Sequence, residues 1–100
     1  MGVADTQFIE PAYKALREGD LESAEARINA YERRFKELPS EEKLLARENL
    51  PQTRIWAYVA KEAITKMKKG ELDKEKLDTY VSNRIKELEN KYISKKKETK

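Results

Sequence analysis

Clusters of acidic residues are the groups in this sequence that could do chemistry. There are three such clusters: Glu22 with Glu25, Glu41 with Glu42, and Glu71 with Asp73 and Glu75. Paired carboxylates can act as general acid and base, and helical bundles that hold two metal ions combine inward-facing Glu with Glu-x-x-His. This chain of 100 residues has no His and no Cys, so the commonest metal ligand, the commonest general base and every thiol site are missing.

The carboxylates are therefore interpreted as helix caps and solvated helix faces. Neither a Gly-rich phosphate loop nor a Gly-x-Ser-x-Gly nucleophile motif occurs in the sequence. We expect a protein that is not an enzyme and that has no cofactor, no metal and no small-molecule substrate.

Basic residues are concentrated in two short segments, 51–70 and 91–100, each of which holds five basic residues and one acidic residue. Arg54, Lys61 and Lys68 are seven residues apart, so a helix would place them on one face. Such a surface can contact the phosphates of nucleic acid, although cations near a helix C-terminus also stabilise the helix dipole. The candidate nucleic-acid-binding residues are Arg54, Lys61, Lys66, Lys68, Lys69, Lys95, Lys96 and Lys97.

Apolar residues at helical spacing offer a second kind of surface. Leu21, Ala24, Ile28, Tyr31, Phe35 and Leu38 recur at intervals of three and four, as do the apolar residues of segment 77–92. Either these stripes meet inside one bundle, or part of them binds a partner. The candidate partner-binding residues are Tyr31, Phe35, Leu38, Leu88, Tyr92 and Ile93. We expect an accessory or adaptor protein that binds a protein partner or forms a homodimer, with nucleic-acid binding as the alternative.

One segment resembles a known docking peptide. Segment 52–59 has Gln52, an aliphatic residue at Ile55 and an aromatic residue at Tyr58, as in the peptides by which replication proteins bind the sliding clamp. Val59 stands where those peptides have a second aromatic residue. The resemblance implies an exposed peptide, whereas the apolar run 55–60 is also the best core candidate in the chain.

Proline and glycine residues divide the chain into helices and predict an all-α fold. Pro11 suits the first turn of a short helix that Gly19 ends, and Asp20 suits the N-cap of a long second helix over residues 21–38. Ser40 precedes a third helix that contains Leu44, Leu45 and Leu50 and ends at Asn49 and Pro51. A fourth helix over residues 52–69 is apolar around most of its circumference, and Asp73 is the expected cap of a long last helix.

We therefore predict a compact bundle of four to five helices over residues 1–93, with long second and C-terminal helices and a mobile basic tail over residues 94–100. Charged residues make up 41% of the chain and are mostly Lys and Glu, a composition typical of proteins from thermophiles. The apolar run 55–60 is far shorter than the roughly 20 residues that span a bilayer, and residues 1–10 lack the pattern of a signal peptide. A cytoplasmic protein without a membrane segment is expected.

Overall fold

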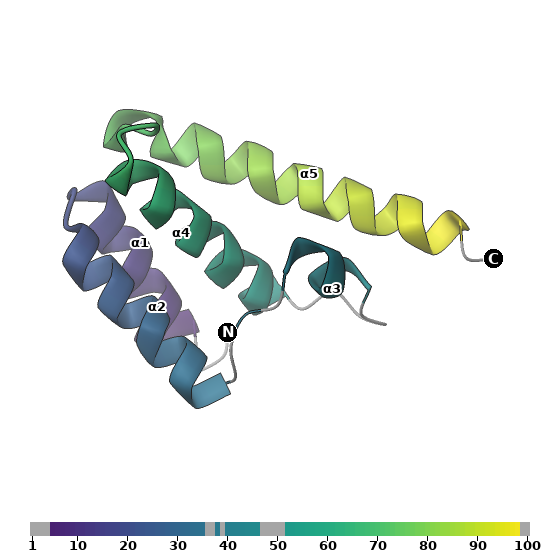
Figure 1. The fold of residues 1–100 in the computed structure, drawn as a ribbon, viewed down its shortest axis with the longest axis horizontal. Helices are drawn as coiled ribbons and strands as arrows, with labels where there is room; N and C mark the ends of the chain where they lie inside the picture. The colour runs from purple at the N-terminus through teal and green to yellow at the C-terminus, as the bar shows by residue number, and fades with distance from the viewer. Residues whose placement is uncertain (1–4, 36–37, 39, 47–51, 99–100) are drawn as a thin grey trace.

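The computed structural model describes residues 5–35, 38, 40–46 and 52–98, with residues 5, 6 and 96–98 described by their backbone alone. Every regular element in these ranges is helical and none is a strand (Figure 1), which confirms the predicted all-α bundle. In chain order the elements are a π-helical turn η1 (Asp5–Ile9), α1 (Glu10–Arg17), α2 (Leu21–Phe35), α3 (Glu41–Leu45), α4 (Gln52–Lys68), a 3-10 turn η2 (Lys74–Lys76) and α5 (Leu77–Glu98).

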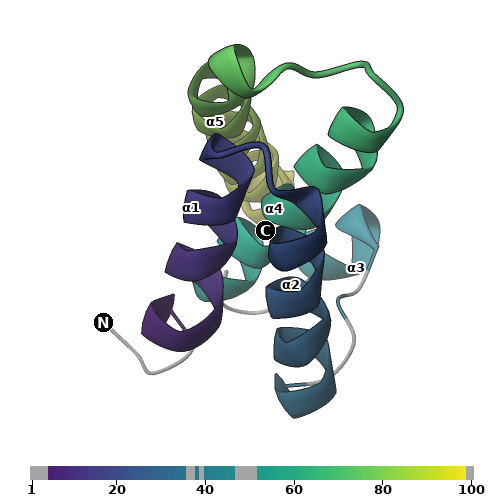
Figure 2. The same cartoon turned by 90° about the vertical axis from the view of Figure 1, so that its left-hand side faces the viewer.

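The turn between α1 and α2 has the capping residues predicted from the sequence. Gly19 adopts a φ of +77°, the left-handed conformation that ends many helices and that residues with a Cβ rarely adopt. The Asp20 carboxylate accepts hydrogen bonds from the Ser23 backbone N–H at 3.1 Å and from the Ser23 hydroxyl at 2.7 Å. These two caps reverse the chain within a few residues and pack α1 antiparallel to α2 (Figure 2).

α3 is a short helix that starts at the predicted residue. The Ser40 hydroxyl accepts a hydrogen bond from the backbone N–H of Lys43 at 3.4 Å, and Glu41 and Glu42 occupy the first turn. At this position their negative charges interact favourably with the positive end of the helix dipole. Leu44 and Leu45 are buried, whereas Asn49, Leu50 and Pro51, which were expected to end this helix, lie outside the described residues.

The connection from α4 to α5 differs from the prediction at Asp73. Gly70 has a φ of +75° and ends the helical turn after α4, as expected. Asp73 has the extended backbone of an N-cap, but its side chain makes no capping hydrogen bond, and the residues it precedes form η2 instead of the first turn of α5. The 3-10 turn is closed by a backbone bond from the Lys76 N–H to the Asp73 carbonyl at 3.0 Å. Backbone geometry therefore starts this last helix without a side-chain cap.

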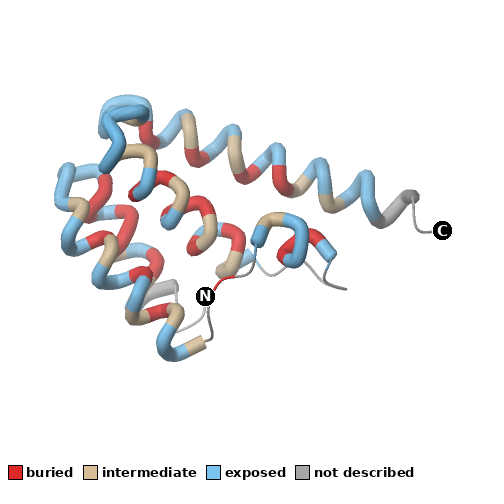
Figure 3. The backbone as a smooth tube through the Cα atoms, in the orientation of Figure 1, coloured by how far each residue is buried: buried red, intermediate tan, exposed pale blue. Residues whose placement is uncertain are grey.

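The core is built around α4, which is buried on several sides (Figure 3). Its buried residues are Ile55, Ala57, Val59, Ala60, Ala63 and Ile64, and the three alanines allow neighbouring helices to approach closely. α4 packs against α1, α2 and α5, and Figure 2 shows α1 and α3 on opposite sides of it. The predicted central, broadly apolar fourth helix is confirmed, and Ile55 and Val59 are too buried to act as part of an exposed docking peptide.

The two long helices end at positions other than those predicted. α2 is described as far as Phe35, and Leu38 is buried but not helical, so the apolar stripe that was expected to run to Leu38 is not one continuous helix face. α5 continues through Glu98, five residues beyond Ile93, where its apolar pattern stops. The far end of α5 projects past α4 (Figure 1), and the molecule measures 44 × 28 × 22 Å.

Candidate functional site

The residues predicted to bind a partner differ widely in their exposure. Tyr31, Leu38 and Leu88 are buried, with 3%, 9% and 0% of their surface exposed. They contribute to the interior of the bundle, which is the alternative that the sequence left open. Phe35 and Tyr92 are half-buried, and Ile93 is 52% exposed. Of the six residues, Ile93 is therefore the one most accessible to another molecule.

An aromatic cluster explains why Tyr31 and Phe35 are not freely accessible. Phe8 from η1 lies edge-on to both rings, with centroid distances of 6.3 Å to Tyr31 and 6.0 Å to Phe35. The Tyr31 and Phe35 rings are 5.1 Å apart on α2. The turn before α1 thus folds over the end of α2 and covers the face that the sequence suggested for a partner.

The predicted basic face of α4 is largely engaged within the molecule. Lys61 Nζ lies 2.8 Å from Glu32 Oε1, and Lys68 Nζ lies 2.5 Å from Glu25 Oε2, both on α2. Arg54 donates from Nη2 to the carbonyl oxygen of Phe35 at 2.5 Å. Because α2 supplies acceptors for these cations, the charge that the face offers to a phosphate backbone is reduced.

Of the remaining predicted basic residues, Lys66 and Lys69 line one shallow groove together with Lys61 of that face. Lys66 Nζ lies 3.8 Å from Glu71 Oε1, and Lys69 is exposed at the end of α4. Lys95 lines a different groove, between α3 and α5. The side chains of Lys96 and Lys97 lie outside the described residues.

A groove between α1 and the start of α4, in which aromatic and charged side chains lie together, was not predicted from the sequence. It has a volume of about 710 Å³ and contains Trp56, which is 38% exposed. The Trp56 ring lies edge-on to Tyr13 with centroids 5.5 Å apart, and the Tyr13 hydroxyl donates to the Trp56 carbonyl at 2.6 Å. Ile9 and Thr53 also line this groove, which we call the Trp56 groove, and charged side chains of α1 form its rim.

Trp56 was placed in the core because it lies within the apolar run 55–60. Its helical neighbour one turn earlier is the exposed Gln52, and residues four apart share a helix face. That polar neighbour was the available signal that Trp56 points away from the interior.

The Trp56 groove continues toward α5. Gln52, which lines the groove, donates from Nε2 to Glu89 Oε2 at 3.4 Å, and Ile93 follows Glu89 by one helical turn. Trp56 and Ile93 are the large hydrophobic residues exposed on the described part of the chain. The Gln52–Glu89 contact therefore joins the Trp56 groove to α5, the helix that carries Ile93.

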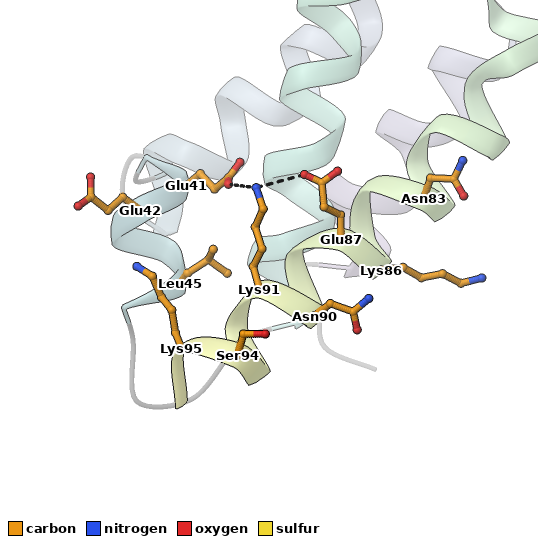
Figure 4. A pocket seen from close by; sticks show the side chains of 10 residues that line it. All are labelled: Glu41, Glu42, Leu45, Asn83, Lys86, Glu87, Asn90, Lys91, Ser94 and Lys95. Carbon is orange, nitrogen blue, oxygen red and sulfur yellow. Dashed lines mark hydrogen bonds and ion pairs between the residues drawn. The ribbon is translucent and has the colours of Figure 1, made fainter. Parts of the chain in front are cut away.

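A second groove, between α3 and α5, is open and is lined mostly by polar and charged residues (Figure 4). Its volume is about 860 Å³, and its lining includes Glu41, Glu87 and Lys91. Lys91 Nζ lies 2.9 Å from Glu41 Oε2 and 3.2 Å from Glu87 Oε2. Lys91 thus pairs with both carboxylates and helps to hold α3 against α5.

Arg84 lies beside this groove and joins three helices. Its Nε and Nη2 donate to the two carboxylate oxygens of Glu62 on α4 at 2.9 and 3.1 Å, and its Nη1 donates to Glu87 at 2.8 Å. Nη2 also pairs with Glu41 on α3. Hydrogen bonds from Arg84 and then Lys91 lower the pKa of Glu41 below its ordinary value, while burial, reinforced by the charge of Glu62, raises the pKa of Tyr80 to about 12.

These ionisable groups form a structural ion-pair network. In the described ranges no three His, Cys, Asp or Glu side chains converge as metal ligands would. Each carboxylate of the network accepts hydrogen bonds from Arg84. The pKa values of Tyr58 and Tyr80 are both raised, chiefly by burial and then by the charge of Glu62, so both phenols are protonated near neutral pH. The arrangement holds α3, α4 and α5 together.

Among the described residues no helix has the length and apolar character needed to cross a bilayer. Comparison of the chain with protein-family models, with curated proteins and with solved structures gives no match in any of the three.

Proposed function

We propose that this chain is a small non-catalytic accessory protein that binds another protein through the Trp56 groove between α1 and α4. The observation that carries the proposal is the exposure of Trp56 in the groove that it lines with Ile9 and Tyr13. Tryptophan is among the residues most enriched in binding hot spots, because a large rigid ring gains much when its remaining surface is buried. Ile93, on α5, is the second large hydrophobic residue exposed on the described part of the chain.

The charge arrangement favours a protein over nucleic acid as the partner. Binding to nucleic acid depends on cations that neutralise phosphates, and Lys61 and Lys68 instead pair with Glu32 and Glu25 of α2. A groove with an aromatic lining and a mixed-charge rim suits a protein surface, whose interface cores are poor in charge and whose rims are polar. The cytoplasmic location expected from the sequence is kept in this proposal.

Site-specific cross-linking tests the proposal. A photoreactive amino acid replaces Lys14 on the rim of the Trp56 groove, and the matched control carries it at Ala26, which is exposed on α2. We expect the chain to cross-link to a defined protein from position 14 and not from position 26. Purified complex should persist at high salt and be lost with Trp56→Glu, whose helicity is checked by circular dichroism.

Two results would count against the proposal. Equal cross-linking from both positions would show that the groove has no preference. Cross-linking to DNA or RNA, with binding that falls steeply between 50 and 200 mM salt and with a triple variant Lys66→Glu, Lys68→Glu and Lys69→Glu, would establish the nucleic-acid alternative.

A further inference from the structure

The charges on the rim of the Trp56 groove are arranged in a pattern that complements itself. Glu10, Lys14 and Arg17 line the groove and are exposed on α1, and their spacing of four and three residues puts them in one row. The acid lies at the N-terminal end of the row, and the two cations lie in the middle and at the C-terminal end. Positions 10 and 17 are about 10 Å apart along the helix axis.

A two-fold axis across the middle of α1 would match this row with a second copy of itself. When two α1 helices lie antiparallel with the axis between positions 13 and 14, Glu10 of each copy faces Arg17 of the other. Lys14 then faces position 13, which is Tyr13, and not another lysine. The contact between Glu10 and Arg17 occurs twice because a two-fold interface is symmetric.

The side chains in this row are available for such contacts. In the ranges that the structure describes, Glu10 and Lys14 form no ion pair. Arg17 Nε contacts Asp78 Oδ1 at 3.1 Å, but both side chains are more than half exposed, at 56% and 76%. An exposed pair of this kind is held weakly, so Arg17 can also contact a second carboxylate.

We infer that the occupant of the Trp56 groove is a second copy of this chain, in a two-fold dimer whose α1 helices pack antiparallel. This inference rests on the proposed function and names the partner. Each Trp56 would bury its exposed surface against α1 and α4 of the other copy.

Charge reversal at Glu10 and Arg17 tests the inference, because reversing both charges together should restore the dimer that either reversal alone weakens. Analytical ultracentrifugation of the purified chain should give about 23 kDa, twice the mass of the 11.7 kDa chain. Glu10→Arg or Arg17→Glu alone places like charges opposite each other twice and should weaken the dimer about tenfold. The double variant Glu10→Arg/Arg17→Glu should dimerise again, and the two single variants should pair when mixed.

Control variants and a second readout separate the interface from the fold. Glu22→Arg and Arg33→Glu reverse exposed charges on α2, and Asp78→Asn removes the internal partner of Arg17; none should change the dissociation constant by more than about twofold. Trp56 is the chain's one tryptophan, so its fluorescence maximum should move to shorter wavelength as dimer forms.

A chain that stays monomeric at 100 µM, or a dimer that the double variant and the mixed single variants do not restore, would overturn the inference. The proposed function would survive a monomeric result if position 14 still cross-linked to a different protein. If position 14 cross-linked to nothing, both would fail.

Discussion

Replacing Arg84 with methionine removes the cation shared by Glu41, Glu62 and Glu87 and keeps most of the apolar length of the side chain. The Arg84 side chain is 14% exposed and Glu62 is 26% exposed, so the pair lies between the surface and the interior. Exposed ion pairs contribute about 0–1 kcal/mol, whereas breaking a buried pair costs about 3–5 kcal/mol.

The geometry places the cost of removing Arg84 between those two limits. Two parallel hydrogen bonds, at 2.9 and 3.1 Å, join its guanidinium to Glu62, and bidentate contacts of this kind are among the strongest ion pairs. Glu87 is 52% exposed and adds little. We therefore expect Arg84→Met to lower the free energy of unfolding by about 2 kcal/mol at pH 7, equivalent to roughly 8 to 16 °C in melting temperature.

Acid should reduce the difference between the variant and the wild type. The lowered pKa of Glu41 contributes stability that is present above its unfolded value of 4.5 and is lost as the pH falls through the lower value of the folded state. Arg84 is the first cause of that lowering, so the variant lacks most of this contribution at neutral pH. The two unfolding curves should therefore converge as the pH falls below 4.5.

Urea unfolding at pH 7 and pH 3, followed by circular dichroism, measures both effects. Lys68→Met is the matched control, because it breaks an exposed pair in which Lys68 and Glu25 are 47% and 44% exposed, and it should cost no more than about 0.5 kcal/mol. A loss below about 0.5 kcal/mol for Arg84→Met, or a loss that is unchanged at pH 3, would refute this account of the network.

Three further perturbations test other parts of the structure. Gly19→Ala should cost about 1 kcal/mol because the φ of +77° strains a residue with a Cβ; the new Cβ would meet Lys74 Cδ at an ordinary 3.7 Å, so a loss near zero would show that the turn relaxes. Tyr13→Phe should cost about 1 kcal/mol by removing the 2.6 Å hydrogen bond to the Trp56 carbonyl, and an unchanged urea midpoint would contradict that contribution. Burial raises the pKa of Tyr80 to about 12, so its contribution to stability should be present below pH 10 and lost as the pH rises through 12. Tyrosinate absorbance and unfolding, measured together, would show this loss. Ionisation of Tyr80 at pH 10 without loss of structure would be inconsistent with its burial.

The sequence was sufficient for features that depend on neighbours along the chain. Gly19, Asp20 and Ser40 were predicted as caps, and each has the backbone angle or hydrogen bond expected of it. Local chemistry determines such positions, because the partner of a cap lies only a few residues away. The number of helices and the central place of α4 followed from the positions of Pro and Gly and from the breadth of its apolar face.

Features that depend on distant residues were predicted less well. The basic face of α4 looked accessible because Glu25 and Glu32, which pair with Lys68 and Lys61, come about 30 to 40 residues earlier in the chain. Trp56 looked like a core residue, although the crossing of α1 over α4 leaves its edge exposed. A one-dimensional pattern shows which residues share a helix face, but it does not show which helix covers that face.

The small size of α3 has a consequence for how the molecule opens. A helix of five residues is not stable alone in water, so α3 keeps its shape only while Leu44 and Leu45 are buried and Glu41 is held by α5. Amide hydrogens of α3 should therefore exchange with solvent through a local opening that leaves α1, α2 and α4 folded. That opening would uncover one flank of α5 and would become more frequent in strong salt, which weakens the contacts made by Glu41.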